Sequence, residues 1–407
     1  MLRITRPTSG AGSFYAALGH GMTIVNLFEF RPVHVAYTEN HVDDPHMYRM
    51  VLASLRELGA FEDIVQQGRI RGAQAGIWFS ETADIWGDNH GSRAAAKRAL
   101  YTAIRHGQLP VDVVIEQDAL DGTLSNYKLL YLTDPHVSRA ATARLAEWVH
   151  QGGCLFATAE AGRFDELNQP NEPLQKLLGI ELLQTESPPE SHVTWIKQDL
   201  PFATPIDTVH PSEITQGVVE PGASHRSSPV FGTCTRFRTL EECQVLFRFR
   251  DGSPAAVSRT VGNGRVIYCG FLPGLSYYLP AIPRRPVDRG ATDDSMAHFL
   301  PTQFDHNMRS LITLPADLVE RPVVCSEPLV ESCIIESPHG TAIVLVNWTG
   351  KFQKNLQVTV HLPNLPRQAL LATGPSVTGE IKDESLVFRL DLDVADALIL
   401  RPNSRLE

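Results

Sequence analysis

Tyr127-Lys-Leu-Leu-Tyr-Leu-Thr133 and Cys154-Leu-Phe-Ala-Thr158 are short apolar runs that flank a helical segment starting near Ser138 and stopping at Gly152-Gly153. Ser138 is a suitable N-cap, and a glycine pair ends a helix because glycine tolerates the backbone conformation found there. An apolar run on each side of an amphipathic helix indicates parallel strands that are buried on both faces. The stretch therefore predicts an α/β core.

The same alternation continues on both sides of this stretch. Ala75-Gly-Ile-Trp-Phe-Ser80 and Val111-Asp-Val-Val-Ile115 read as two further strands, and the segment from Arg93 to His106 between them has apolar residues at helical spacing. Downstream, Gly262-Asn-Gly264 predicts a hairpin turn whose second strand, Arg265 to Phe271, completes the sheet. We therefore expect the α/β fold class, with a parallel sheet and helices on both of its faces.

The two ends of the chain follow different patterns. After Pro322, alternating apolar runs separated by turns predict a small all-β sandwich. Before residue 72 we expect a helix ending at Gly21, a strand over Met22 to Phe30 and a helix starting at Pro45. These few elements cannot cover both faces of the strand, so they need a partner. That partner is either the α/β core or a segment outside this sequence. The expected divisions are residues 1–71, a strand with linking helices; 72–280, the α/β domain; 281–320, a loop and helix linker; and 321–404, the β-sandwich.

Composition excludes several classes of protein. The chain has 407 residues, of which 43% are hydrophobic and 20% charged, and a formal net charge of −10. The length accommodates two or three domains. The negative charge argues against a nucleic-acid partner, because phosphate binding needs a basic surface. No apolar run reaches the ~20 residues that span a bilayer, and the first residues lack the apolar segment of a secretory signal. We expect no membrane partner and a cytoplasmic location.

The sequence gives one weak indication of a metal site, the cluster of Glu39, His41, Asp43, Asp44 and His46, but Asp43 and Asp44 are better interpreted as the start of a helix. Its six cysteines are scattered without a C-x-x-C pair, a spacing that fits reduced thiols rather than a disulfide scaffold or a zinc site. It has no P-loop, no G-x-S-x-G and no H-E-x-x-H motif. We therefore expect neither a metal ion nor a cofactor.

Four stretches carry a resemblance to a known family: Ala17 to Phe30; Tyr127 to Tyr131 together with Trp148 to Leu155; Gly262 to Phe271; and Gly340 to Trp348. In this order they resemble the C-terminal two-thirds of the family-42 glycoside hydrolases, the β-galactosidase family. The resemblance implies the last helix and eighth strand of a TIM barrel, then a flavodoxin- or glutamine-amidotransferase-like α/β domain that mediates trimerisation, then a small β domain. The first 71 residues would then be a remnant of the barrel.

The sequence departs from that family where the chemistry would take place. Such enzymes use two glutamates on barrel strands as acid/base and nucleophile, and those strands would lie upstream of Phe14. The resemblance thus implies a non-catalytic oligomerisation or accessory module that forms a trimer or dimer with itself and is not active alone. Amidotransferase chemistry needs a cysteine in the turn after the fourth strand, and the turn from Ala157 to Gly162 has none.

Two candidate substrate-binding residues follow the predicted N-terminal strand. Glu29 and Arg31 lie at its carboxyl end, where barrel enzymes place functional groups. In an intact barrel enzyme the pair could touch a sugar. Without a barrel, an exposed ion pair is the simpler interpretation.

Five further candidates follow strands of the α/β core. Asp84, Trp86, Asp88 and His90 lie in the predicted loop after the first core strand, at the edge where open α/β sheets bind ligands, and Glu160 lies in the turn after the fourth. Aromatic rings stack on sugars, and carboxylates accept hydrogen bonds from sugar hydroxyl groups. The alternative interpretation is structural: Trp86 packs to hold its loop, and Glu160 belongs to a polar, acidic turn. These residues define an alternative function, a hydrolase or carbohydrate-binding protein acting at the carboxyl edge of the sheet; if active, it would be glycoside hydrolase-like.

Overall fold

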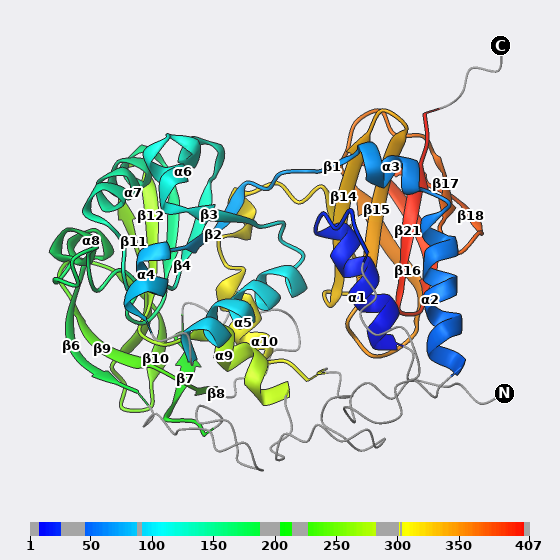
Figure 1. Ribbon diagram of the computed structural model, residues 1–407. Helices are drawn as coiled ribbons and strands as arrows, with labels where there is room; N and C mark the ends of the chain where they lie inside the picture. The colour runs from blue at the N-terminus through cyan, green and yellow to red at the C-terminus, as the bar shows by residue number, and fades with distance from the viewer. Residues whose placement is uncertain are drawn as a thin grey trace, which may run out of the picture. The chain divides into compact units, whose positions relative to one another are not determined.

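The computed structural model describes residues 8–25, 45–87, 92–187, 204–213, 227–281, 301 and 303–402. The chain divides into two compact units (Figure 1). Unit 1 comprises Met1–Arg71, Arg285–Thr302 and Arg321–Glu407, and unit 2 comprises Gly72–Arg284 and Gln303–Glu320. Unit 1 is therefore assembled from stretches that lie far apart in the sequence, whereas the two stretches of unit 2 are close together in it.

A nine-stranded mixed sheet forms the centre of unit 2, in the order β3-β2-β4-β5-β12-β11-β10-β7-β8. Its strands are β2 Ala75–Phe79, β3 Asp112–Ile115, β4 Leu129–Leu132, β5 Cys154–Ala157, β7 Asp207–Pro211, β8 Ser228–Val230, β10 Gln244–Phe249, β11 Pro254–Val261 and β12 Gly264–Cys269. The pairs from β3 to β12 are parallel and the others are antiparallel. The four predicted core strands and the β11–β12 hairpin are confirmed, but the antiparallel half makes the sheet mixed rather than parallel.

Helices cover both faces of this sheet, as the sequence predicts (Figure 1). Leu130 and Leu132 of β4 join one apolar cluster with residues of α7, whereas Tyr131, which alternation directs to the opposite face, donates its hydroxyl hydrogen to the backbone oxygen of Ile312 in α10 at 2.7 Å. The helices of unit 2 are α4 Glu81–Trp86, α5 Ser92–His106, α6 Glu116–Leu120, α7 Arg139–Gln151, α8 Glu172–Leu178, α9 Pro273–Tyr278 and α10 His306–Ile312. A separate two-stranded sheet pairs β6 Ile180–Glu186 with β9 Cys234–Thr239.

The predicted ends of α7 are both confirmed. The Ser138 hydroxyl oxygen accepts the Ala141 N–H at 3.2 Å, and Gly152 follows the helix with a φ of +128°. Only a residue without a side chain takes that φ at low cost, so Gly152 fixes the point at which the chain leaves the helix and enters β5.

Unit 1 contains two β-sheets and helices from the N-terminal part of the chain. A six-stranded sheet has the order β1-β14-β15-β21-β17-β18, and a four-stranded sheet has the order β13-β16-β20-β19. Residues of both sheets share one apolar core, which is the arrangement of a β-sandwich. The elements are α1 Thr8–Gly19, α2 Pro45–Leu58, α3 Glu62–Gln67, β1 Arg69–Ile70, β13 Val323–Cys325, β14 Val330–Ser337, β15 Gly340–Asn347, β16 Gln353–Val360, β17 Gln368–Leu371, β18 Ser376–Thr378, β19 Glu380–Lys382, β20 Ser385–Leu392 and β21 Ala395–Leu400.

A second core lies on the other face of the six-stranded sheet. Tyr15 and Leu18 of α1 and Ile64 of α3 pack there against Val344 and Ile399. The described part of the N-terminal segment thus finds its partner in the C-terminal strands, a partner that the sequence analysis did not consider. Met22 to Val25 have no regular structure, and the rest of the strand predicted over Met22 to Phe30 lies outside the described residues.

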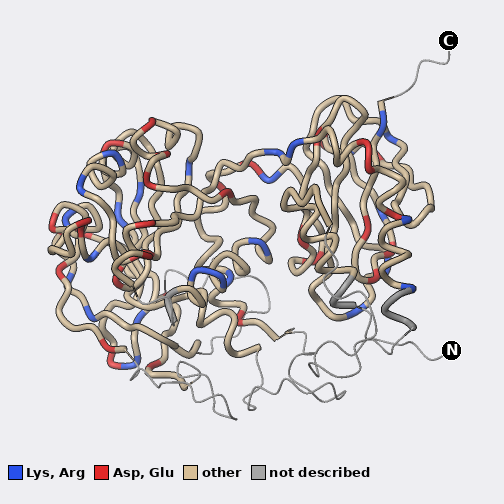
Figure 2. Tube along the Cα trace, viewed as in Figure 1, with Lys and Arg blue, Asp and Glu red and all other residues tan. Residues whose placement is uncertain are grey.

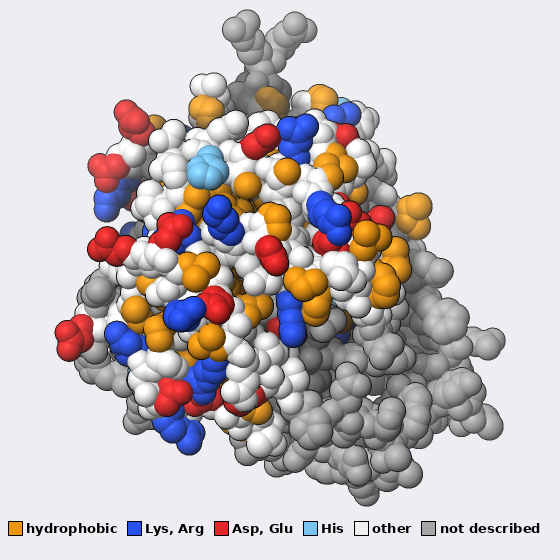
Figure 3. All heavy atoms as spheres, turned by 90° about the vertical axis from the view of Figure 1, so that its left-hand side faces the viewer, with side chains coloured by type: hydrophobic (Ala, Val, Ile, Leu, Met, Phe, Trp, Pro, Cys, Tyr) orange, Lys and Arg blue, Asp and Glu red, His pale blue; other side chains and the backbone are white. Residues whose placement is uncertain are grey.

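Charged side chains of both signs are interspersed along the described chain (Figure 2). The face of the molecule in Figure 3 shows acidic and basic side chains next to each other with hydrophobic ones between them, and no large field of one sign among the described residues. Among the described helices, none has the length and apolar character needed to cross a membrane.

The contact between α5 and α9 depends on a glycine. A Cβ at Gly274 would lie 2.4 Å from the backbone nitrogen of Leu100 and 2.7 Å from its Cα, too close for any side chain. We expect Gly274→Ala to lower the free energy of unfolding by about 1–3 kcal/mol, the usual cost of overpacking. Gly72→Ala is the control, because its Cβ would meet nothing closer than Asp112 Oδ2 at 3.8 Å. Urea unfolding measures both; equal midpoints would contradict the prediction.

Candidate functional site

The parallel strands of unit 2 bring several polar residues to one edge of the sheet. β2, β4 and β5 pair side by side and end at Phe79, Leu132 and Ala157. The residues that follow them therefore meet at the carboxyl edge, where open α/β sheets bind ligands. Ser80, Asp134 and Glu160 each come within three residues of these strand ends.

Asp134 organises the first part of this edge. Its carboxylate accepts the backbone N–H of Ser80 at 2.8 Å and pairs with the Lys97 ammonium at 2.8 Å. The Lys97 ammonium also lies 4.4 Å from the centre of the Phe79 ring, a cation–π contact. Burial raises the pKa of Asp134 above its ordinary value, although Lys97 and the Ser80 N–H act in the opposite direction. Lys97 thus offsets part of the free-energy cost of burying the Asp134 carboxylate.

The prediction of a loop after β2 is wrong for residues 81–86. Glu81–Trp86 forms α4, whose N-cap is Ser80: the Ser80 hydroxyl oxygen accepts the Ala83 N–H at 3.1 Å. Asp84 is therefore a helical residue in the first turn of α4, where the helix dipole favours a carboxylate. Trp86 is the last residue of that helix. The sequence analysis placed Ser80 at the end of the strand and did not identify it as a helix N-cap.

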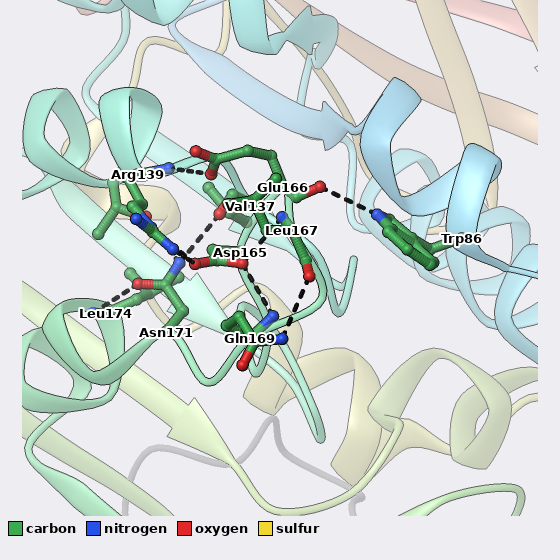
Figure 4. A network of polar contacts seen from close by, with 10 residues as sticks. Trp86, Val137, Arg139, Asp165, Glu166, Leu167, Gln169, Asn171 and Leu174 are labelled. Carbon is green, nitrogen blue, oxygen red and sulfur yellow. Dashed lines mark hydrogen bonds and ion pairs between the residues drawn. The ribbon is translucent and has the colours of Figure 1, made fainter.

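Trp86 is tied to the loop after β5. Its indole N–H donates to the backbone oxygen of Glu166 at 3.1 Å, as Figure 4 shows. Its ring lies nearly parallel to that of His136, with centroids 6.2 Å apart, and His136 is in turn stacked on Phe164 at 5.3 Å. Half of the Trp86 side chain nevertheless remains exposed. The expectation that Trp86 packs its surroundings thus agrees with the structure, and part of the ring also remains accessible to a ligand.

Glu160 lies in a strained turn and is ion-paired. Its φ of +63° is in the left-handed region, which a residue with a side chain enters only at a cost. Its carboxylate pairs with the Arg163 guanidinium at 2.8 Å, and that guanidinium lies 4.9 Å from the centre of the Phe164 ring. A continuous series of contacts therefore connects Glu160 with Trp86 through Arg163, Phe164 and His136.

Asp165 holds the rest of the loop. It pairs with Arg139 at 2.6 Å and accepts the backbone N–H groups of Leu167 and Gln169, both at 2.9 Å (Figure 4). Asn171 caps α8 through the Leu174 N–H and donates to the backbone oxygen of Val137 at 3.0 Å. These contacts fix the loop on which Trp86 rests.

The structure thus brings together three of the seven predicted site residues. Asp84, Trp86 and Glu160 lie along one edge of the sheet, while Glu29, Arg31, Asp88 and His90 lie outside the described residues. Sequence reasoning missed Lys97, Asp134 and His136. Asp134 could have been found, because Asp-Pro directly follows a predicted strand at the same edge, whereas Lys97 had no such signal.

The arrangement limits the chemistry available at this edge. Asp134, Glu160 and Asp165 are each paired with a cation, so each carboxylate already serves to hold structure. A carboxylate that is engaged by a cation has to give up that contact before it can donate a proton to a substrate or attack it. The exposed part of Trp86 remains the surface best suited to contact a ligand.

Removal of Lys97 should make stability dependent on pH. Asp134 has a raised folded-state pKa, so ionising it costs folding free energy as the pH rises above its ordinary value of 3.8, and Lys97 offsets that cost. We expect Lys97→Met to lose roughly 3–5 kcal/mol at pH 7, the range for breaking a buried pair. The loss should shrink towards pH 4, where Asp134 is increasingly protonated in both states. Urea unfolding at both pH values tests this, and Lys97→Met/Asp134→Asn is the control that should recover part of the loss at pH 7.

Comparison with known proteins identifies the unit that carries this edge. Residues 77–279 match the protein family described as the β-galactosidase trimerisation domain. The β-galactosidase BgaH of Haloferax lucentense is 24% identical over 294 residues, which cover 66% of this chain and 39% of BgaH. The chain therefore spans about two fifths of that relative.

Solved structures share the fold over almost the whole chain. The structure of a catalytic mutant of Gan42B, a GH42 β-galactosidase from G. stearothermophilus, matches with a TM-score of 0.61 at 17% identity, covering 98% of this chain and 51% of that one. An α-L-fucosidase isoenzyme from Paenibacillus thiaminolyticus matches with a TM-score of 0.60 at 13% identity, covering 98% and 58%. These likenesses concern the fold, which occurs in enzymes for two different sugars. The chain is related to the family-42 β-galactosidases, and its residues 77–279 match their trimerisation domain.

Proposed function

We propose that this chain is a non-catalytic oligomerisation module, and that unit 2 joins copies of it into a homo-oligomer, with a trimer favoured over a dimer. The match of residues 77–279 to the trimerisation domain carries the proposal. The ion-paired carboxylates at the carboxyl edge support it, because each already makes a structural contact that catalysis would have to break.

An exposed apolar cluster of unit 2 is the proposed contact between copies. Ile85 and Trp86 of α4 are 82% and 50% exposed, and Leu167 of the following loop is 60% exposed. The bond from Trp86 to Glu166 brings Leu167 close to α4. Large apolar side chains grouped on a surface mark interaction sites more often than scattered ones do. Burying this cluster between copies would remove it from water.

The mass of the particle in solution tests this contact. We expect the wild-type chain to run as a homo-oligomer in light scattering after size exclusion. Ile85→Asp/Leu167→Asp should weaken assembly at least about tenfold, since two charges would have to be desolvated at the interface. Leu240→Asp is the matched control: Leu240 is 52% exposed but lies at the end of β9, away from α4, and its variant should assemble like wild type. A monomeric wild type would contradict the proposed oligomerisation, and an unchanged double variant would contradict the proposed surface.

The second candidate function is carbohydrate binding or hydrolysis at the same edge. The specific observation in its favour is Trp86, a half-exposed indole supported from behind by His136, with Asp84 on the same helix. A sugar ring could stack on the indole while carboxylates accept its hydroxyl hydrogens.

Turnover and affinity separate the two functions. The first function predicts no hydrolysis of nitrophenyl galactosides and no binding of galactosides that calorimetry can detect. The second predicts a measurable affinity that Trp86→Ala lowers about tenfold, equivalent to 1.4 kcal/mol, and any activity should be lost in Asp88→Asn and Glu160→Gln. Val113→Ala, on an exposed apolar residue of β3, is the control for nonspecific effects. Activity that survives both carboxylate variants would remove the second function at this edge.

A further inference from the structure

Two residues with metal-binding side chains share a face of β14 in unit 1. Glu331 and Cys333 are two residues apart, so their side chains leave the strand on the same side. α1 packs against β14 and β15. Gly19, the last residue of α1, allows this approach: a Cβ there would lie 2.9 Å from the Cβ of Cys333 and 3.1 Å from its sulfur. The next residue is His20.

The three side chains converge at the end of α1. The His20 Nε2 atom lies 2.8 Å from Glu331 Oε1, and the Cys333 sulfur lies 4.0 Å from the same oxygen. All three potential ligand atoms lie within 4.8 Å of one another. Nitrogen, oxygen and sulfur donors from one helix end and one strand therefore surround a single point.

The surroundings divide the cluster into a buried part and an accessible part. The Glu331 side chain is only 7% exposed, at the border of the apolar core formed by α1, α3 and the sheet, whereas 37% of the His20 side chain is exposed. The Trp348 indole N–H donates to the other carboxylate oxygen, Glu331 Oε2, at 3.0 Å. A carboxylate placed beside an apolar core is costly unless its charge is compensated, and a bound cation would add to the compensation that the His20 and Trp348 contacts give.

We propose that His20 Nε2, Glu331 Oε1 and the Cys333 sulfur bind a zinc ion, with a water molecule at the exposed fourth position. Tetrahedral zinc with its usual bond lengths places ligand atoms about 3.4–3.6 Å apart. The present separations of 2.8 Å and 4.0 Å lie on either side of that value. Side-chain movements of roughly half an ångström or more would bring these separations to the tetrahedral value, and the Trp348 indole would hold the second carboxylate oxygen as an outer partner.

The proton balance of binding follows from the ligand types. The Cys333 thiol releases its proton to solvent and binds as a thiolate. The hydrogen shared between His20 Nε2 and Glu331 Oε1 at 2.8 Å has to leave that contact as well, either to solvent or to His20 Nδ1, before Nε2 can bind the ion. At least one proton therefore leaves for each ion bound, so affinity should rise with pH.

The site would attach α1 to the sandwich. His20 and Glu331 are separated by 311 positions in the sequence, so an ion between them joins the N-terminal segment to the C-terminal strands. Metal affinity of this kind is also folding free energy, because the unfolded chain does not assemble the ligands. The inference concerns unit 1 and does not depend on the function proposed for unit 2.

Cobalt(II) is the probe for this site, because a cobalt–thiolate bond gives a charge-transfer absorption that a plain histidine–glutamate hydrogen bond cannot give. We expect the full-length chain to bind one equivalent of Co²⁺ with this band, and added Zn²⁺ to displace it. Cys333→Ser should abolish the band, and His20→Ala and Glu331→Gln should each weaken binding about tenfold or more. Cys243→Ser, another partly buried cysteine but in unit 2, should behave as wild type.

Two further variants test the geometry while the ligands stay intact. Gly19→Ala should also weaken Co²⁺ binding, because its methyl group would push α1 away from Cys333. Gly12→Ala in the same helix meets Val394 at an ordinary 3.5 Å and should bind as wild type. If Cys333→Ser or Glu331→Gln does not fold, His20→Ala decides the question, because the His20 side chain is the more exposed of the pair at 37%. Absence of the thiolate band in wild type, its persistence in Cys333→Ser, or an unchanged Co²⁺ affinity in His20→Ala would overturn the proposal.

Discussion

The parallel pairing of β5 with β12 is the constraint on which unit 2 depends. It aligns residues 154–157 with residues 265–268, more than a hundred positions later in the chain, and joins the parallel half of the sheet to the antiparallel half. The hairpin turn before β12 fits directly against the end of α7. The Asn263 N–H donates to the His150 backbone oxygen at 3.0 Å, and a Cβ at Gly264 would lie 2.0 Å from the backbone oxygen of Val149. Glycine is thus required where the two halves of the sheet meet.

This joining of the two halves also determines the carboxyl edge. Because β2, β4 and β5 are held in register, Ser80, Asp134 and Glu160 stand next to one another without any tight local motif. Most of the charges brought together there are then paired within the loop and helix starts. A fold shared by β-galactosidase and fucosidase structures therefore does not by itself select a substrate. Whatever unit 2 binds must be read from its surface, where Trp86 is the most informative side chain.

Sequence patterns predicted those parts of the structure that depend on local rules. Unbroken apolar runs predicted β4 and β5, Ser138 predicted the start of α7, and Gly262-Asn-Gly264 predicted the β11–β12 hairpin. α4 was missed because its six residues are too few for a helical period to emerge, although Ser80 is a good N-cap. β17, β18 and β19 were missed because they are three or four residues long and partly exposed, so tertiary pairing rather than propensity makes them strands. The contacts of Lys97 with Asp134 and of His20 with Glu331 arise only on folding, and no spacing rule could have found them.

The interrupted course of the chain has a practical consequence for dividing this protein into expressible pieces. Unit 1 begins before unit 2 and ends after it, and β1 pairs with β14 across that interruption. Cutting the gene at residue 72 to isolate the C-terminal strands would strip Tyr15, Leu18, Phe61 and Ile64 from the outer face of their sheet. The resulting fragment would expose the apolar face of this sheet and an unpaired strand edge, and both features promote aggregation. Workable truncations of this gene should therefore excise unit 2 as an internal insertion and splice its flanks, rather than trim from either end.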